Sequence, residues 1–503
     1  MEIFQTLREL PLLKAPGPDG YHALFFQTHW SSLGPSIIQV IQEIFEQLTI
    51  PPSWGDTNLV LIPKVAHPKL INQFRPISLY NTLYKLLSRI IVQRLKPFMT
   101  EVINPCQAGF VPGRRTSDNI IIVQEAIRTL ISRRGRTGYV ALKLDLDKAY
   151  DRLEWPFIQD TLEFFRVPPS LITLIMNMIS STRFHILWNG SPLSEVIPSR
   201  GIRQGDPLSP YLFILCLKRL SIKLTEAVQN KKIHPLHFRT GVHLSHLFFA
   251  DDIFLFTRAT VKDYTNQNHL LREFCAMSDQ LMSANKSKTW FSPRTPRQTK
   301  DQVAGILGLP TTDRIGTYLG MPIFSTRRTV SSYQYLVDNI RKRIEGWQAR
   351  YLSMASRATL IKASVTSIPL YAMQTAILPQ KICQHIDKLS CHFLWGDTNG
   401  RKGCHTVNRD TVTLPKEAGG LGITSTRYRN QAILMNQAWH LYSTPSSLWA
   451  QILKAKYFPQ ATLFTGLRSA RRSHIWTVIS LRVELLCEGM RWFVGDGQTI
   501  RVW

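Results

Sequence analysis

Residues 246–256 read HLFFADDIFLF, and the interpretation of the whole chain starts from them. Two neighbouring acids, Asp251 and Asp252, lie between two runs of apolar and aromatic residues that each have the length of a strand. Strand-forming residues on both sides of a short polar break predict a tight hairpin with the acids at its tip. Two buried like charges are unfavourable unless a cation neutralises them, so the tip is a candidate site for divalent metal. An ordinary polar turn is the alternative, and the other motifs decide between the two.

The composition is that of a globular protein with a large excess of positive charge. A chain of 503 residues exceeds one hydrophobic core, so about two to four domains are expected. Hydrophobic residues make up 44% and aromatic residues 10%, which excludes a disordered chain. Lys and Arg number 61 against 34 Asp and Glu, a net charge of +27. This excess favours a polyanionic partner, with nucleic acid first and an anionic membrane surface second.

Cysteine usage and hydropathy indicate a soluble intracellular protein. The 7 cysteines show no paired framework, which suits a reducing compartment. The first 20 residues lack the basic start and apolar core of a signal peptide. The longest uncharged apolar stretches, such as 171–179 and 211–217, are too short to span a bilayer, so no membrane partner is expected.

Residues 140–145 form the clearest predicted strand, and its last residue is an acid, Asp145. This carboxylate could lie near the two acids of the hairpin. The apolar residues of the strand point to one face, so Asp145 emerges on the other. Two-metal phosphoryl transfer needs carboxylates from different strands, and Asp145 and Asp251 are suitable donors. Between them, residues 201–213 contain glycines that allow close backbone approach and Gln204, which can touch a base or a sugar.

Elsewhere the pattern is mainly helical. A strand is expected over 59–64, and residues 74–79 lead into a helix that runs to about 95. Ser117 or Asp118 is the expected N-cap of a helix that ends near 132. Other helices are expected at 35–48, 333–347, 356–367, 379–395 and 427–442, with a boundary at 397–403 and a strand pair near 495–502.

Three blocks, in this order, resemble the catalytic motifs of reverse transcriptases: KLDLDKAYDR at 143–152, RQGDPLSP at 203–210 and FADD at 249–252. The Phe-Ala-Asp-Asp form is typical of non-LTR, LINE-type retrotransposons. Further blocks shared with that branch occur at 14–20, 61–64, 74–79, 107–114, 285–288, 318–322 and 414–422. The combination resembles plant LINE-type polymerases most, and strongly so over about residues 10–325.

The resemblance implies an α+β fold, a right-hand polymerase with fingers, a palm with an antiparallel sheet, and a helical thumb, followed by a mainly helical basic C-terminal region. The implied domains are an N-terminal extension (1–48), fingers (49–135), palm with interleaved finger segments (136–325), thumb or connection (326–397) and a basic C-terminal region (398–503). That last region is expected to be truncated, and an upstream endonuclease domain to be lacking.

The resemblance also implies a metal site with two Mg²⁺ ions, for which Mn²⁺ could substitute. Asp145 and Asp251 would hold the metals, and the Leu146 carbonyl would complete the shell. Asp252 would lie beside them as a supporting or metal-contacting residue.

The nucleotide site follows from the same resemblance. Lys64 and Arg75 match finger residues that clamp the triphosphate. Tyr150 matches the aromatic residue that crowds a ribose 2′-hydroxyl and so favours deoxynucleotides. Gln204 and Gly205 would lie along the template and the nucleotide.

Lys288 matches the basic residue that could protonate the leaving pyrophosphate, and Tyr318, Leu319 and Gly320 match the primer grip. Structural alternatives stay open for several of these residues. Lys64 and Arg75 could be solvated surface charges, and Tyr150 could be a core residue. Three other acids are expected to be structural or solvent-facing: Asp147, Asp151 and Asp206.

One group of potential zinc ligands falls within 23 residues: Cys383, His385, Cys391, His392, Cys404 and His405. Their spacing is not that of a Cys-x₂-Cys framework, so the expectation is against zinc. The basic stretch 468–472 is expected to grip a nucleic-acid backbone without reading sequence.

The predicted function is that of an enzyme, an RNA-directed DNA polymerase of a non-LTR retrotransposon. Its partners would be an RNA template, a DNA primer and dNTPs, and target-primed reverse transcription would place it in the nucleus. The alternative is a non-catalytic RNA-binding relic of such an element, or a maturase-like protein. The oligomeric state does not follow from the sequence.

Overall fold

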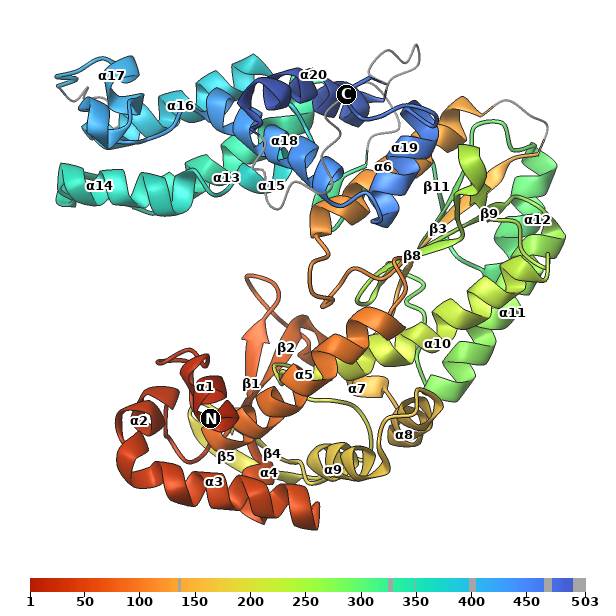
Figure 1. Cartoon of the computed structure of the whole chain (residues 1–503), viewed down its shortest axis with the longest axis vertical. Helices are drawn as coiled ribbons and strands as arrows, with labels where there is room; N and C mark the ends of the chain where they lie inside the picture. The colour runs from red at the N-terminus through yellow and green to blue at the C-terminus, as the bar shows by residue number, and fades with distance from the viewer. Residues whose placement is uncertain (134–136, 324–328, 348, 398–403, 466–472, 492–503) are drawn as a thin grey trace, which may run out of the picture. The chain divides into compact units, whose positions relative to one another are not determined.

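The computed structural model describes residues 1–133, 137–323, 329–347, 349–397, 404–465 and 473–491 (Figure 1). The chain divides into two compact units. The first unit comprises residues 1–115, 134–236 and 244–313, and the second comprises 116–133, 237–243 and 314–503. Within the described ranges, no helix combines the length and the apolarity that crossing a membrane requires.

The first unit contains a four-stranded sheet with the order β2-β1-β4-β5. Strand β1 (Asp56–Pro63) pairs antiparallel with β2 (Phe74–Tyr80) and parallel with β4 (Arg183–Trp188), while β5 (Ser191–Val196) forms the edge. Residues 74–79, expected only to lead into a helix, therefore form a strand. A residue that precedes proline favours the extended conformation, which holds for the residue before Pro76.

The first unit also contains a five-stranded sheet with the order β11-β10-β3-β9-β8. Its central strand is β3 (Tyr139–Asp145), which runs antiparallel to both β10 (Lys288–Phe291) and β9 (Asp252–Arg258). Strand β8 (His246–Phe249) pairs antiparallel with β9, and β11 (Thr311–Thr312) closes the other edge. The predicted hairpin and the predicted antiparallel sheet are both present.

Helices cover this sheet and fill the core of the first unit. Leu144 and Leu255, from β3 and β9, join one buried cluster with Phe213 from α10 (Ser209–Gln229). Helix α11 (Val261–Ser278) packs against α10. Burial of these apolar faces supplies the main driving force for folding and leaves the ends of the strands free for polar groups.

The first unit contains further short and long helices besides α10 and α11. Helix α3 (Trp30–Gln47) begins five residues before the expected start at Pro35, so that this proline lies inside the helix. The other elements are α1 (Glu2–Arg8), α2 (Ala23–Thr28), α4 (Pro52–Gly55), η1 (Ile71–Gln73), α5 (Thr82–Val102), α7 (Ala149–Arg152), α8 (Trp155–Phe164), α9 (Pro169–Ser180) and α12 (Arg297–Leu307). Two short strands, β6 (Leu236–His237) and β7 (His243–Leu244), flank η2 (Arg239–Gly241), and residues 237–243 of this segment belong to the second unit.

The second unit is mainly helical, and the predicted helices beyond residue 333 are present in it. Its helices are α6 (Thr116–Ser132), η3 (Val330–Tyr333), α13 (Gln334–Glu345), η4 (Ala349–Tyr351), α14 (Met354–Leu360), η5 (Ile361–Val365), α15 (Leu370–Met373), α16 (Gln380–Trp395), α17 (Arg409–Thr413), η6 (Lys416–Ala418), α18 (Thr426–Ser443), α19 (Leu448–Tyr457) and α20 (His474–Gly489). A short hairpin of β12 (Thr317–Tyr318) and β13 (Met321–Pro322) precedes most of them. The expected N-cap of α6 is wrong, since the helix already begins at Thr116.

Helix α6 is bound to the rest of the second unit by a buried carboxylate. Glu125 is 1% exposed and accepts hydrogen bonds from Lys456 Nζ at 2.6 Å, Tyr457 Oη at 2.7 Å and Ser473 Oγ. About two helical turns earlier, Asp118 Oδ2 lies 3.4 Å from His440 Nε2. These partners neutralise charges that would be costly to bury alone.

The architecture confirms the predicted fold class: mixed α and β, antiparallel-rich sheets and a helical C-terminal region. Three sequence predictions lie wholly or mostly outside the described residues. They concern the boundary at 397–403, the basic stretch 468–472 and the strand pair near 495–502.

Candidate active site

Three acids meet at one end of the five-stranded sheet. Asp145 ends β3 and is the cross-strand partner of Asp252, the first residue of β9. Directly opposed residues of an antiparallel pair have Cβ atoms about 4.5–5.5 Å apart, so these two carboxylates are neighbours. Asp251 lies at the hairpin tip, after Ala250, whose φ of +52° turns the chain from β8 into β9. The structure therefore brings the predicted acids from separate parts of the sequence to one place.

The surroundings of this acid cluster disfavour its negative charge. The Asp251 side chain is partly open to solvent, yet desolvation by the protein around it raises its pKa, as it raises that of Asp252. The negative charge of Asp145 raises both further. Lys143 opposes this effect at Asp252, with its Nζ 3.8 Å from Oδ1. The site thus concentrates negative charge that a bound cation would relieve.

The donor set of this site suits magnesium. Mg²⁺ prefers oxygen ligands and, in nucleotide sites, is usually bound by one or two carboxylates together with substrate phosphates. Leu146 forms an isolated bridge with Met282 whose hydrogen bonds use the Asp145 carbonyl and the Asp147 amide, not the Leu146 carbonyl. In the part of the chain that the structure describes, no group of three or more His, Cys, Asp and Glu side chains forms a ready metal cage. The oxygen atoms of the three carboxylates are of the ligand type that Mg²⁺ prefers.

A lysine that the sequence analysis does not single out contacts the acid cluster. Lys286 Nζ lies 3.3 Å from Asp145 Oδ1, although the lysine side chain is 64% exposed. The predicted Lys288 instead opens β10, opposite Lys143, and is exposed. Both lysines belong to one block, and their spacing alone gives no reason to choose between them.

The predicted aromatic gate borders the same cluster. Tyr150 lies in α7, and its ring stacks on Phe213 with centroids 5.0 Å apart and planes at 19°. Burial raises the pKa of Tyr150, and the charge of Asp251 raises it further. The Tyr150 phenol therefore stays protonated close to the acid cluster, and stacking on Phe213 holds its ring in place.

Strand β2 hydrogen-bonds to the backbone carbonyls of Gln204 and Gly205. The Ser78 amide donates to the Gln204 carbonyl at 3.1 Å, and Tyr80 Oη donates to the Gly205 carbonyl at 2.8 Å. Gly205 has φ = +110°, which side-chain-bearing residues rarely adopt. The side chain of Gln204 donates from Nε2 to Asp151 Oδ1 at 3.1 Å.

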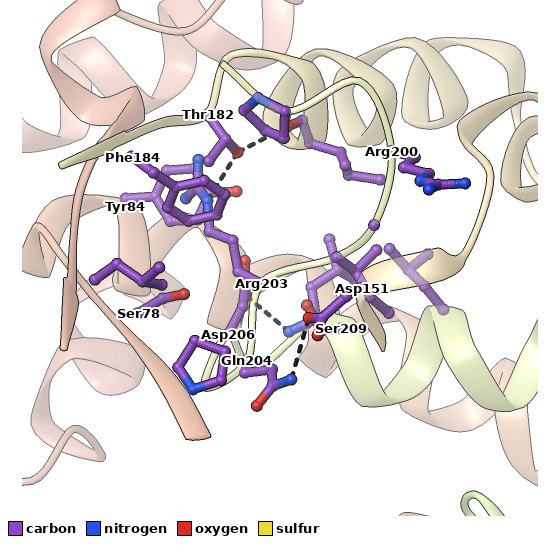
Figure 2. A pocket seen from close by; sticks show the side chains of 18 residues that line it. Ser78, Tyr84, Asp151, Thr182, Phe184, Arg200, Arg203, Gln204, Asp206 and Ser209 are labelled. Atoms are coloured by element: carbon purple, nitrogen blue, oxygen red, sulfur yellow. Dashed lines mark hydrogen bonds between the residues drawn. The ribbon is translucent and has the colours of Figure 1, made fainter. Parts of the chain in front are cut away.

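A cavity of about 280 Å³ lies beside this loop (Figure 2). Its lining includes Asp151, Gln204 and Arg203, whose side chain is buried beneath the loop. Arg203 Nε donates to Thr182 Oγ1 at 2.8 Å, and its Cζ lies 4.1 Å from the centre of the Tyr84 ring. The sequence does not point to Arg203, because its partners come from distant segments of the chain.

The other acids near this loop differ in their surroundings. Asp206 is buried and accepts hydrogen bonds from Ser88 Oγ and, at 2.9 Å, from the Leu208 amide, as befits a structural residue. Asp151 is exposed, but the protein around its carboxyl group desolvates it in part and so raises its pKa. The hydrogen bond from Gln204 lowers the pKa of Asp151 in opposition.

The predicted triphosphate clamp lies on the hairpin of β1 and β2. Lys64 is exposed, and its Nζ donates to the Asn72 carbonyl at 3.1 Å. Arg75 is also exposed, and its charge lowers the pKa of Asp251. Lys64 likewise lowers the pKa of Asp151. Lys64 and Arg75 are therefore close enough to lower the pKa of a carboxylate of the site, although both side chains are open to solvent.

The predicted primer grip belongs to the second unit. Leu319 and Gly320 form the turn between β12 and β13, with φ of +48° and +77°. Tyr318 is buried, and its Oη accepts a hydrogen bond from Asn119 Nδ2 at 3.2 Å. Tyr371 Oη donates to the Leu319 carbonyl at 2.7 Å. The turn itself, and not the Tyr318 ring, is the part open to solvent.

The candidate zinc ligands do not form a metal site in the described residues. Cys383 is buried in α16, and its Sγ lies 3.8 Å from the Leu378 carbonyl. Asp397 Oδ2 lies 2.8 Å from His392 Nδ1 and 3.2 Å from His405 Nε2. These two histidines thus share one carboxylate partner.

Comparison with known proteins gives a family match that contains all three acids. A family model described as "Reverse transcriptase (RNA-dependent DNA polymerase)" matches residues 62–323, just over half of the chain. The Transposon TX1 uncharacterized 149 kDa protein of Xenopus laevis is 29% identical over 468 residues, which are 91% of this chain and 34% of that protein. The Pol polyprotein of the type-2 retrotransposable element R2DM of Drosophila melanogaster is 31% identical over 254 residues, 50% of this chain and 23% of that protein. A putative ribonuclease H protein of Arabidopsis thaliana is 34% identical over 191 residues, 36% of this chain and 30% of that protein. The chain thus spans about a third or less of the length of these relatives.

Proposed function

This chain belongs to the reverse transcriptase family, and from that premise we propose that it is an RNA-directed DNA polymerase of a non-LTR retrotransposon. Family membership confirms the resemblance drawn from residues 143–152, 203–210 and 249–252. One observation carries the proposal: Asp145 and Asp252 are cross-strand partners, and Asp251 occupies the adjoining hairpin tip. Carboxylates converging from two strands are what two-metal nucleotidyl transfer requires.

In the proposed reaction, the 3′-hydroxyl of a DNA primer attacks the α-phosphorus of a dNTP and pyrophosphate leaves. Two Mg²⁺ ions, or Mn²⁺ in their place, would supply Lewis acidity at the attacking and leaving oxygens. Asp145 and Asp251 would hold them, with the Leu146 carbonyl as a further ligand. Asp252 would add negative charge beside them, balanced by Lys143.

Two lysines are candidates for protonating the leaving pyrophosphate. A lysine in that role must lie within reach of the phosphates that the acids help to position. Lys286 already contacts Asp145, and it is therefore the better placed of the two. Lys288 opens the neighbouring strand, two residues further along.

The remaining site residues would select and orient the nucleotide. Lys64 and Arg75 would bind the triphosphate, since both are exposed cations that act on the site's acids. Tyr150 would crowd a 2′-hydroxyl, supported by its fixed stacking on Phe213. Gln204 would lie along the nucleotide and the template.

The proposed partners are an RNA template, a DNA primer and dNTPs, and the net charge of +27 supports a polyanionic partner. The Phe-Ala-Asp-Asp motif at 249–252 and the stretch 414–422 support an origin in a plant LINE-type element. For such an element, target-primed synthesis would take place in the nucleus.

Primer extension on poly(rA)/oligo(dT) with Mg²⁺ tests the proposal. Wild-type protein should extend the primer, and Asp251→Asn should not. Asp160→Asn, on the exposed face of α8, is a matched control that should retain activity. Extension that survives Asp251→Asn would refute the metal assignment. A folded wild type that binds RNA without extending the primer would favour the alternative, a non-catalytic RNA-binding relic or a maturase-like protein.

A further inference from the structure

We infer that Gln107 is a positioning residue that fixes the turn from which Asp251 projects. Its block, residues 107–114, carries part of the resemblance to LINE-type elements, yet no step of the proposed reaction uses it. The inference deepens the proposed function and rests on it, because Asp251 is a proposed metal ligand.

The turn at the hairpin tip needs support from outside its own two strands. The register of β8 with β9 ends at the pair Phe249 and Asp252, so Ala250 and Asp251 form a two-residue connection. Ala250 has φ = +52°, and a positive φ at the first position of such a connection favours glycine. An alanine in this conformation therefore depends on contacts that hold it there.

The Gln107 side chain supplies such a contact. Its Oε1 accepts hydrogen bonds from the Ala250 amide at 3.2 Å and from the Gly109 amide at 3.0 Å. Both partners are donors, so only the oxygen end of the carboxamide can meet them. Gln107 is 3% exposed, so water is not available to replace the bond to Ala250.

The backbone on both sides of Gln107 is bound to β8, the edge strand of its sheet (Figure 1). The Phe248 amide donates to the Cys106 carbonyl at 2.7 Å, and the Ala108 amide donates to the Phe248 carbonyl at 3.1 Å. Gly109 continues this close approach, because a Cβ atom added to it would lie 2.7 Å from the Ala250 nitrogen. The segment therefore follows the hairpin edge up to the turn.

The last residue of the block, Arg114, holds the start of the same segment. Its guanidinium donates to three backbone carbonyls, those of Ile103, Asn104 and Gln107. Since the Gln107 carbonyl is one of them, the backbone that carries the carboxamide is fixed by Arg114 as well as by β8. Both ends of the block thus contribute to one contact with the turn before Asp251.

Hydrogen–deuterium exchange of the metal-free protein, resolved to the Ala250 amide, tests the inference without relying on activity. Gln107→Met keeps the length of the side chain and removes the acceptor. It should raise the exchange rate of this amide about five- to tenfold, the effect of one hydrogen bond. Gln107→Glu keeps an acceptor oxygen and should stay within about twofold of the wild type. Gln267→Met, which replaces a buried glutamine of α11, is the matched control that should leave the rate unchanged.

A Mg²⁺ titration of primer extension tests whether the contact positions Asp251. In Gln107→Met, Asp251 must be reordered before it can bind metal, so the Mg²⁺ concentration that gives half-maximal kcat should rise about five- to tenfold. The KM for dNTP at saturating Mg²⁺ should change less than about twofold, and Gln107→Glu should restore the Mg²⁺ midpoint. A loss of folded protein alone would lower the total rate without moving this midpoint.

Gly109→Ala disturbs the same contact from the backbone side. Its new Cβ atom would press on the Ala250 nitrogen, so both the exchange rate and the Mg²⁺ midpoint should rise. Gly305→Ala, in α12, is the matched control, because its new Cβ atom would meet nothing within 4 Å. If Gln107→Met does not fold, Gly109→Ala decides the question.

The outcomes separate the inference from the proposed function. An exchange rate at Ala250 that stays unchanged in Gln107→Met and Gly109→Ala would overturn the inference while primer extension remained intact, and so would an unchanged Mg²⁺ midpoint. Absence of extension by the wild type would overturn the proposed function, and with it the positioning of a metal ligand, even if the exchange rates confirmed the hydrogen bond.

Discussion

Carboxylates that lie close to other charged groups occur in both units of this molecule, but Glu125 is buried whereas Asp251 is partly open to solvent, and their partners differ. In the second unit, Glu125 accepts hydrogen bonds from an ammonium and two hydroxyl groups. In the first unit, Asp251 and Asp252 are close to each other and to Asp145, and desolvation raises the pKa of both. The first arrangement neutralises its charge within the protein, and the second leaves charge for a ligand to neutralise. The partners of a carboxylate, and not its burial alone, therefore indicate whether it stabilises the fold or is available to bind a ligand.

The largest expected effect is the loss of primer extension when an acid of the first unit, Asp251, is replaced. Asp251→Asn should reduce primer extension by about a thousandfold or more, since it removes several kcal/mol of transition-state stabilisation by bound metal. The same change should leave the thermal unfolding temperature unchanged or higher, because a repulsive charge disappears. A large loss of stability in this variant would mean that the acid cluster is structural, and the comparison would fail.

In the second unit, replacing the buried acid Glu125 should lower stability. Glu125→Ala leaves Lys456 without its carboxylate partner and should cost about 3–5 kcal/mol, the usual penalty for breaking a buried ion pair. Urea unfolding followed by tryptophan fluorescence measures this loss, with Glu125→Gln as the milder control that keeps two hydrogen-bonding atoms. The comparison would be broken if Glu125→Ala were as stable as the wild type.

Lys286, which contacts Asp145, and Lys456, which contacts Glu125, should also differ. Replacing Lys286 should affect activity, and replacing Lys456 should affect stability. Lys286→Ala should lower kcat about ten- to a hundredfold with little change in stability, because a proton donor is lost while water can partly replace it. Lys456→Met should lower stability and leave the kcat of the folded fraction nearly unchanged. Steady-state extension assays, with Lys288→Ala in parallel, decide which lysine serves the reaction.

The smallest expected effect is the response of stability to pH. Because desolvation raises the folded pKa of Asp251 above the ordinary 3.8, the folded state binds more protons than the unfolded state between the two pKa values. This acid therefore favours folding at low pH, and that contribution is lost as the pH rises through the raised pKa. Relative to the wild type, Asp251→Asn should gain stability as the pH rises from about 4 to 7, by at most about 1 kcal/mol, because solvent screens a partly exposed carboxyl group. Unfolding midpoints of both proteins across this range, without divalent metal, measure the difference, and parallel curves would contradict it.

Much of the acid site could be predicted from the sequence, because its determinants are local. Alternating apolar residues place Asp145 on the open face of its strand, and two apolar runs place Asp251 at a hairpin tip. The pairing of Asp145 with Asp252 follows only from the register of two strands, which local pattern cannot supply. The choice between Lys286 and Lys288 depends on a different register, that of β10 with β3.

Contacts between distant segments account for what the sequence does not reveal. The strand at 59–64 is predicted from its own apolar run, but residues 74–79 form a strand by pairing with β1, which their local pattern does not show. The roles of Arg203 and Asp151 depend on partners up to about fifty residues away. Nothing in the local pattern of residues 116–132 indicates that this helix belongs with residues 314–503.

The attachment of α6 has a consequence for the order in which the chain is made. Glu125 leaves the ribosome more than three hundred residues before Lys456, Tyr457 and Ser473. During that interval the helix has no access to the donors that neutralise its acid, so the second unit cannot finish folding until residues 456–473 have been synthesised. A nascent chain halted before residue 456 should therefore remain open to protease along α6, however well the first unit has folded.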